Sequence, residues 1–195
     1  MSSRLPILFV AAAVLLVTGC TARYTGSTNK AAVNIIKEFA NFSVDFSLDK
    51  TAKKPTWTIG YGHTCPCRGS YNPNCIGNAC TVPLNDKFTL PLTNSSADEL
   101  LQEDMKECET CVRENVLYKS LTSNQFSALV SFVHSFGCGQ FQKSDLRNKI
   151  NKGNISGAAK EFEKWAYSGN PPELYEHLRD RRIAERKLFC LGSQC

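Results

Sequence analysis

The chain has 195 residues, of which 42% are hydrophobic and 21% charged, and its formal net charge is +5. This length is enough for one domain with a substantial core. No stripe of Lys and Arg is interleaved with aromatic residues, so nucleic acid is not a predicted partner. The modest positive charge instead favours anionic polymers.

The first 22 residues have the pattern of a secretory signal peptide. Arg4 is a short basic region, Leu5 to Val17 is a continuous apolar run, and Gly19 and Ala22 are small residues suited to cleavage. The apolar run is too short to span a bilayer, and no later stretch approaches that length. We therefore predict a signal peptide over 1–22, a single folded domain over 23–195, and secretion without a membrane span. A minority alternative is a lipid anchor on Cys20, because Val17-Thr18-Gly19-Cys20 resembles a bacterial lipobox.

Nine cysteines follow Cys20, and in a secreted chain they predict a disulfide framework. They are Cys65, Cys67, Cys75, Cys80, Cys108, Cys111, Cys138, Cys190 and Cys195. Because nine is odd, Cys20 is retained and paired, or one thiol is free, or one bridge joins two chains. We expect Cys190 and Cys195 to close a small loop. His63 with the four cysteines from Cys65 to Cys80 could in principle hold zinc, but the spacing matches no C-x2-C pair, so no metal and no cofactor are predicted.

The residues after 28 predict a helix followed by a β-hairpin. Thr28 or Asn29 can cap a helix with apolar residues at helical spacing, which ends near Ala40–Asn41. Apolar and polar residues then alternate over 42–48, which predicts a half-buried strand. After a polar turn over 50–55, residues 57–61 return as a second strand.

The rest of the chain predicts a loop region and then helices. Residues 65–91 are rich in Cys, Pro, Gly and Asn. From residue 95 onward the sequence predicts helices, with capping boxes at Ser96–Glu99 and Thr122–Gln125. The second of these helices should stop at Gly137 and Gly139. Further helices are expected at 146–150, at 158–165 and, after Pro171-Pro172, at 178–189.

Three groups of residues together resemble phage-type lysozymes (glycoside hydrolase family 24), most closely in pattern the secreted fungal members. The first runs from Ile36 through Asp49 to the segment Thr58-Ile59-Gly60-Tyr61-Gly62-His63. The other two are 124–132 with Gly137-Cys138-Gly139, and Arg181-Arg182-x-Ala184-Glu185-x-x-Leu188-Phe189. The resemblance covers roughly residues 31–190. It implies an α+β, lysozyme-like fold with a small β-hairpin lobe, a larger helical lobe and disulfide staples, in which Cys108 or Cys111 pairs with Cys138.

The resemblance also implies a glycoside hydrolase site. Cleavage of a β-1,4 bond needs a proton donor at the leaving oxygen and a second carboxylate. Asp49 matches the family's second carboxylate, and Thr58 matches the threonine that helps to position water. Tyr61 and His63 are candidate substrate contacts, although a hydrogen-bonded His63 that braces the site is the expected role.

The family's proton donor is a glutamate nine residues before the aspartate, and here that position is Ala40. Glu38 is the first candidate to replace it, but two residues along a helix turn a side chain by about 200°, away from the site. Asp45 is a weaker candidate from the following strand. A positioned general acid contributes about 10²–10⁴ in rate, so its loss argues against full activity.

Three N-glycosylation sequons begin at Asn41, Asn94 and Asn154. A glycan on Asn41 would lie beside position 40 and obstruct the site, which weakly supports impaired activity.

Three functions follow as hypotheses. The first is a secreted, monomeric muramidase that hydrolyses bacterial peptidoglycan or a related amino-sugar polymer, with antibacterial effect. The second is a pseudoenzyme that binds N-acetylglucosamine-containing glycans. The third is a cationic protein that acts on membranes, which is disfavoured because no helix places a strongly basic face opposite a wide apolar one.

Overall fold

The computed structural model describes residues 23–40, 42–49, 56–64, 88–168, 173–193 and 195. For Asp49, Thr56 and Ser168 only the backbone is described. The predicted leader over 1–22, with Cys20, therefore lies outside the described residues, as do Asn41 and the cysteines from Cys65 to Cys80.

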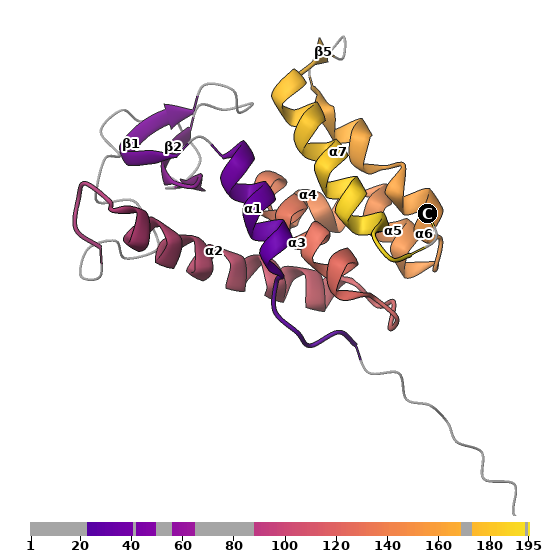
Figure 1. The fold of residues 1–195 in the computed structure, drawn as a ribbon. Helices are drawn as coiled ribbons and strands as arrows, with labels where there is room; N and C mark the ends of the chain where they lie inside the picture. The colour runs from indigo at the N-terminus through magenta and orange to yellow at the C-terminus, as the bar shows by residue number, and fades with distance from the viewer. Residues whose placement is uncertain (1–22, 41, 50–55, 65–87, 169–172, 194) are drawn as a thin grey trace, which may run out of the picture.

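A small sheet and a cluster of helices lie on either side of the first helix, α1 (Lys30–Phe39) (Figure 1). The sheet has the order β1 (Ser43–Asp49), β2 (Thr56–Gly60) and β3 (His63–Thr64), all antiparallel. The predicted hairpin is thus confirmed, and β3 adds a third strand. Val44 is 47% exposed because the β1–β2 register shifts between Ser43 and Ser47, which interrupts the predicted alternation.

The long helix α2 (Asn94–Asn115) connects the sheet to the helical lobe (Figure 1). Its capping box is formed by Thr93 and Ser96, so the prediction of Ser96 with Glu99 was wrong by one turn. Helix α3 (Ser123–Phe136) has the predicted box of Thr122 and Gln125. Both boxes satisfy backbone N–H groups that a helix start leaves without partners.

The remaining elements are short until the last helix. They are α4 (Cys138–Lys143), α5 (Asp145–Asn151), α6 (Ile155–Ala159), the 3₁₀ helix η1 (Phe162–Ala166), β4 (Tyr167–Ser168), β5 (Glu173–Leu174) and α7 (Glu176–Cys190). Gly137 ends α3 with a positive φ of 79°, as predicted, but Gly139 lies inside α4 rather than ending a helix. The single helix predicted over 158–165 is divided between α6 and η1.

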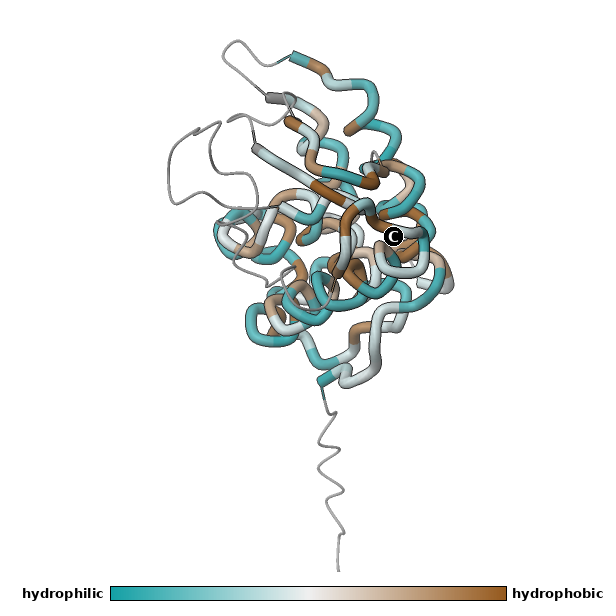
Figure 2. The backbone as a smooth tube through the Cα atoms, turned by 90° about the vertical axis from the view of Figure 1, so that its left-hand side faces the viewer, coloured by the Kyte–Doolittle hydropathy of each residue, from teal (hydrophilic) through white to brown (hydrophobic). Residues whose placement is uncertain are grey.

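Helix α3 is the centre of the core. Every residue from Gln125 to Val133 is buried, and α1, α2 and α7 pack around it. Hydrophobic segments accordingly gather in the middle of the helical lobe, and hydrophilic segments lie along its outside (Figure 2). A smaller apolar cluster joins Ile59 of β2 to Leu100 of α2 and holds the sheet against that helix.

Two disulfides are described, and both were expected. Cys111 pairs with Cys138, which links α2 to the start of α4, and Cys190 pairs with Cys195. Cys108 is a free thiol. Burial, and secondarily the charge of Asp104, raises the pKa of Cys108 to about 12, so this thiol is poorly suited to nucleophilic or redox chemistry.

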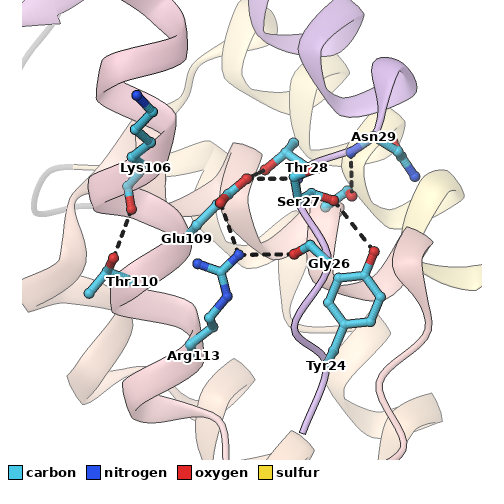
Figure 3. Close-up of polar contacts among 10 residues, drawn as sticks. Tyr24, Gly26, Ser27, Thr28, Asn29, Lys106, Glu109, Thr110 and Arg113 are labelled. Carbon is cyan, nitrogen blue, oxygen red and sulfur yellow. Dashed lines mark hydrogen bonds and ion pairs between the residues drawn. The ribbon is translucent and has the colours of Figure 1, made fainter.

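The residues before α1 are clasped onto α2 by one glutamate (Figure 3). The carboxylate of Glu109 accepts hydrogen bonds from the backbone N–H and the hydroxyl of Thr28, both at 2.7 Å, and from Arg113 at 2.9 Å. Burial opposes ionisation of Glu109, but these bonds from Thr28 and Arg113 outweigh it and lower the pKa. Arg113 also donates to the carbonyl of Gly26, so the segment enters α1 at a fixed position.

Asn29 then caps α1, as one of the two predicted candidates. Its side chain accepts from the N–H of Ala32. None of the helices in the described ranges is long and apolar enough to cross a bilayer.

Candidate functional site

The C-terminal end of α1 presents position 40. The N–H of Ala40 donates to the carbonyl of Ile36 at 2.8 Å, and its backbone is extended, so the helix is regular up to the residue where the chain leaves it. Glu38 is exposed on the solvent side of this regular helix. No bulge or frayed turn brings Glu38 round to the side of position 40.

Thr58 lies in the central strand of the sheet. Its register partners are Ser47 of β1 and Thr64 of β3, and its hydroxyl donates to the carbonyl of Ser47 at 3.4 Å. Asp49 ends β1 two residues after Ser47, opposite Thr56. The hairpin therefore brings the backbones of Asp49 and Thr58 onto neighbouring strands. Asp45, the weaker candidate acid, is exposed and bonds to the N–H of Phe46.

The turn between β2 and β3 touches the end of α1. Gly60 and Gly62 have positive φ values of 63° and 85°, a conformation that favours glycine. A methyl group placed on Gly62 would lie 3.9 Å from Cβ of Ala40 and 3.7 Å from Cε1 of His134. Gly62 thus sits between position 40 and α3 without crowding either.

Tyr61 and His63, on either side of Gly62, point into packed surroundings. Nδ1 of the buried His63 is 2.7 Å from Oδ1 of Asp104, which ties β3 to α2. The ring of Tyr61 is half-buried, 5.0 Å from the ring of Phe42, with the Lys37 ammonium 5.1 Å from its centroid. These contacts brace the turn. Asp104 was not identified from the sequence, because 41 residues separate it from His63 and no spacing rule connects them.

His134, also missed from the sequence, faces the turn from α3. Both of its ring nitrogens are buried and have no hydrogen-bond partner among the described residues, although the residue as a whole is half-buried. Burial, followed by the charges of Arg181 and His63, lowers the pKa of His134 to about 3. At neutral pH the imidazole is therefore uncharged.

This burial predicts acid-sensitive stability. The unfolded chain takes up a proton on His134 below its ordinary pKa of 6.5, whereas the folded chain does so only near 3. Between these values the unfolded state binds more protons, so stability is lost as the pH falls from 6.5 towards 3. We expect urea denaturation across this range to show that the free energy of unfolding falls less steeply with decreasing pH for His134→Phe than for the unmodified chain. Equal slopes for the two proteins would contradict the assignment.

A buried ionic cluster lies behind His134. The carboxylate oxygen Oε1 of Glu185 accepts from Ser131 at 2.7 Å, from Arg181 at 3.1 Å and from Arg182 at 2.9 Å. Glu185 and Arg182 have no exposed surface, and Arg181 is 6% exposed. Arg181 also donates to the carbonyl of Ser131. The Glu185 carboxylate is thus ion-paired with two guanidinium groups, so it is not available as a proton donor.

In the described part of the chain, Gly62 and His134 at the turn beside position 40 do not supply an acid. Gly62 has none to offer, and His134 is neutral, with a pKa too low for it to carry a proton to donate at neutral pH. The sheet places the backbone of Asp49 beside the strand that carries the Thr58 hydroxyl, but α1 supplies no carboxyl at position 40. Nor is any group of three or more His, Cys, Asp or Glu among the described residues placed to hold a metal ion.

Solved structures of lysozyme-like proteins share this fold. The muramidase domain of SpmX from Asticaccaulis excentricus superposes with a TM-score of 0.66 at 28% identity, over 84% of this chain and 97% of that domain. The endolysin of Escherichia coli O157:H7 phage FAHEc1 gives a TM-score of 0.65 at 22% identity, over 89% of this chain and 99% of that one, which shows the fold. The predicted lysozyme-like architecture is confirmed.

Sequence relatives point the same way. The endolysin of Bacillus phage B103 is 32% identical over 164 residues, which is 84% of this chain and 54% of the relative, so the chain spans about half of that protein. The endolysin of Acyrthosiphon pisum secondary endosymbiont phage 1 is 35% identical over 68% of this chain and 79% of its own length. The Phage lysozyme family profile matches residues 37–185. With the profile covering most of its length, the chain belongs to the phage lysozyme family.

Proposed function

We propose that this protein is a secreted muramidase that acts on the β-1,4 bonds of bacterial peptidoglycan, with a rate limited by the missing acid at Ala40. One observation carries the proposal: Asp49 and Thr58 lie on neighbouring strands of a sheet whose β2–β3 turn lies beside the end of α1. Family membership supports the choice of substrate, since the relatives include endolysins and a muramidase domain.

The proposed chemistry assigns a role to each residue. The carboxylate of Asp49 activates water or stabilises the oxocarbenium-like transition state. Thr58 donates its one hydroxyl proton to Ser47, so the oxygen lone pairs remain to accept a hydrogen bond from that water. Bond cleavage also needs a proton at the leaving oxygen, and its donor would stand at position 40. Without it the rate falls by about 10²–10⁴.

The second candidate function is binding of N-acetylglucosamine-containing glycans without cleavage. The observation that favours it is the absence of a carboxyl at Ala40, together with the outward position of Glu38. A site that keeps its glycan contacts but lacks the acid is expected to bind the glycan chain without hydrolysing it.

Secretion is part of the same proposal. The two described disulfides suit an oxidising compartment. Asn94, at the first position of α2, and Asn154, the cap of α6, are both exposed, which suits them to carry glycans.

The test compares clearing and binding of purified peptidoglycan by the oxidised protein and by its Asp49→Ala and Ala40→Glu variants. Slow clearing by the unmodified chain that Asp49→Ala abolishes supports the muramidase. Binding without clearing, with Ala40→Glu restoring clearing, supports the glycan-binding alternative. If the unmodified chain and Ala40→Glu neither bind nor clear the polymer, both functions are wrong.

A further inference from the structure

Two apolar side chains lie exposed beside each other on the small sheet β4–β5. Tyr167 and Leu174 are direct partners in the antiparallel register, and they are 54% and 39% exposed. Directly opposed residues of an antiparallel pair share one face of the sheet, so the ring and the branched apolar group form one surface. We call this the Tyr167–Leu174 surface.

The sheet that carries this surface is anchored at the end where β4 begins and β5 stops. The N–H of Tyr175, just after β5, donates to the carbonyl of Ala166, just before β4, at 2.9 Å. Trp165 packs its ring against Phe132 and Phe136, with centroids 5.2 and 4.9 Å apart. An exposed ring on an anchored backbone loses less conformational freedom when a ligand covers it.

The last turn of α3 connects the Tyr167–Leu174 surface to the candidate site. His134 lies against Gly62 in the turn beside position 40, whereas Phe136, two residues later, contacts Trp165, two residues before Tyr167. Figure 1 shows β5 and the start of α7 on one side of the C-terminal end of α1, with β1 and β2 on the other. The β4–β5 sheet thus lies on the opposite side of the end of α1 from the β1–β2 hairpin.

We propose that the Tyr167–Leu174 surface is a subsite for an N-acetylglucosamine residue of the glycan strand. The apolar C–H face of the sugar ring stacks on Tyr167, and Leu174 contacts the apolar edge of the sugar or its acetamido methyl group. This inference rests on the proposed function, because it extends the same site along the same polymer.

Size and charge favour this occupant. Two side chains cannot make a protein–protein interface, which needs about 1,000 Å² of buried surface, but they match one sugar ring. Glu173 is the register partner of Ser168, so it lies on the opposite face of the sheet. Glu176 is paired with Arg179 at 3.4 Å. Neither acid therefore offers a free charge to a ligand on the surface, which suits a neutral sugar such as N-acetylglucosamine.

The test measures binding of chitotetraose, a neutral N-acetylglucosamine tetramer, by calorimetry. Tyr167→Ala and Leu174→Ala should each weaken binding about three- to tenfold, as expected for loss of an aromatic or apolar contact. Tyr167→Phe, which keeps the ring, and Leu117→Ala, which removes a 56% exposed side chain after α2, should bind as the unmodified chain does. Unchanged binding by Tyr167→Ala, or equal loss in Tyr167→Phe or Leu117→Ala, would overturn the stacking subsite.

A kinetic arm separates this inference from the proposed function. In the Ala40→Glu background, Tyr167→Ala should raise the KM for peptidoglycan about three- to tenfold with kcat unchanged. If Ala40→Glu clears walls and Tyr167→Ala does not change KM, the subsite is wrong while the proposed function stands. If the unmodified chain and Ala40→Glu neither bind nor clear peptidoglycan, the proposed function and the subsite are both wrong.

Discussion

Replacing Ala40 with glutamate is expected to raise the rate of peptidoglycan hydrolysis about 10²–10⁴-fold, the typical contribution of a positioned general acid. Position 40 is half-buried at the end of a regular helix, with an extended backbone that glutamate adopts without strain. Gly62 leaves space beside it, and the neutral His134 adds no charge that would deprotonate the new carboxyl. The measurement is the initial rate of clearing of purified peptidoglycan at matched protein concentration.

Ala40→Gln is the control for this gain. Glutamine has nearly the same shape as glutamate but cannot donate a carboxyl proton, so it should stay at the rate of the unmodified chain. A rate for Ala40→Gln equal to that of Ala40→Glu would mean that the longer side chain aids binding or folding and that acid catalysis is not the cause.

Glu185→Gln is expected to lower the free energy of unfolding by about 3–5 kcal/mol, because it leaves two buried guanidinium groups without their counter-charge. Arg182 has no exposed surface, and burial lowers its pKa to about 10 even though Glu185 raises it. Its guanidinium also lies 5.1 Å from the ring of Phe132 and 4.8 Å from that of Phe136, but neither ring carries a negative charge to replace the carboxylate. Urea denaturation at neutral pH measures the loss.

Glu163→Gln provides a matched exchange on the surface. Glu163 of η1 pairs with Arg186 of α7, and these side chains are 46% and 42% exposed. Because water screens such a pair, we expect a loss of less than about 1 kcal/mol. Similar losses in Glu163→Gln and Glu185→Gln would show that burial of the cluster does not govern its contribution to stability.

The elements nearest the site could be predicted because their signals are local. The cap at Asn29, the box of Thr122 and Gln125, the end of α3 at Gly137 and the hairpin each depend on residues a few positions apart. The errors were local too. Thr93 and Ser96 formed a box one turn before the predicted one, and Gly139 entered α4 because Gly137 alone had already ended α3.

The contacts behind the site could not be predicted, because they join distant parts of the chain. His63 meets Asp104, Glu185 meets Ser131, and His134 faces Gly62, and no periodicity or spacing links these pairs. The β4–β5 sheet was missed because its strands are two residues each, and the prolines between them predict only a break.

By itself, the sequence determined the family, the order of the hairpin and the longer helices, and the absence of an acid at Ala40, since these depend on residue identity and local spacing. Among the described residues, the tertiary structure decided that three candidate groups do not take the place of that acid. Glu38 is exposed to solvent, and Glu185 is ion-paired with two arginines. His134 is neutral because it is buried. Those outcomes depend on burial and on charges brought together by packing, which are properties of the folded chain.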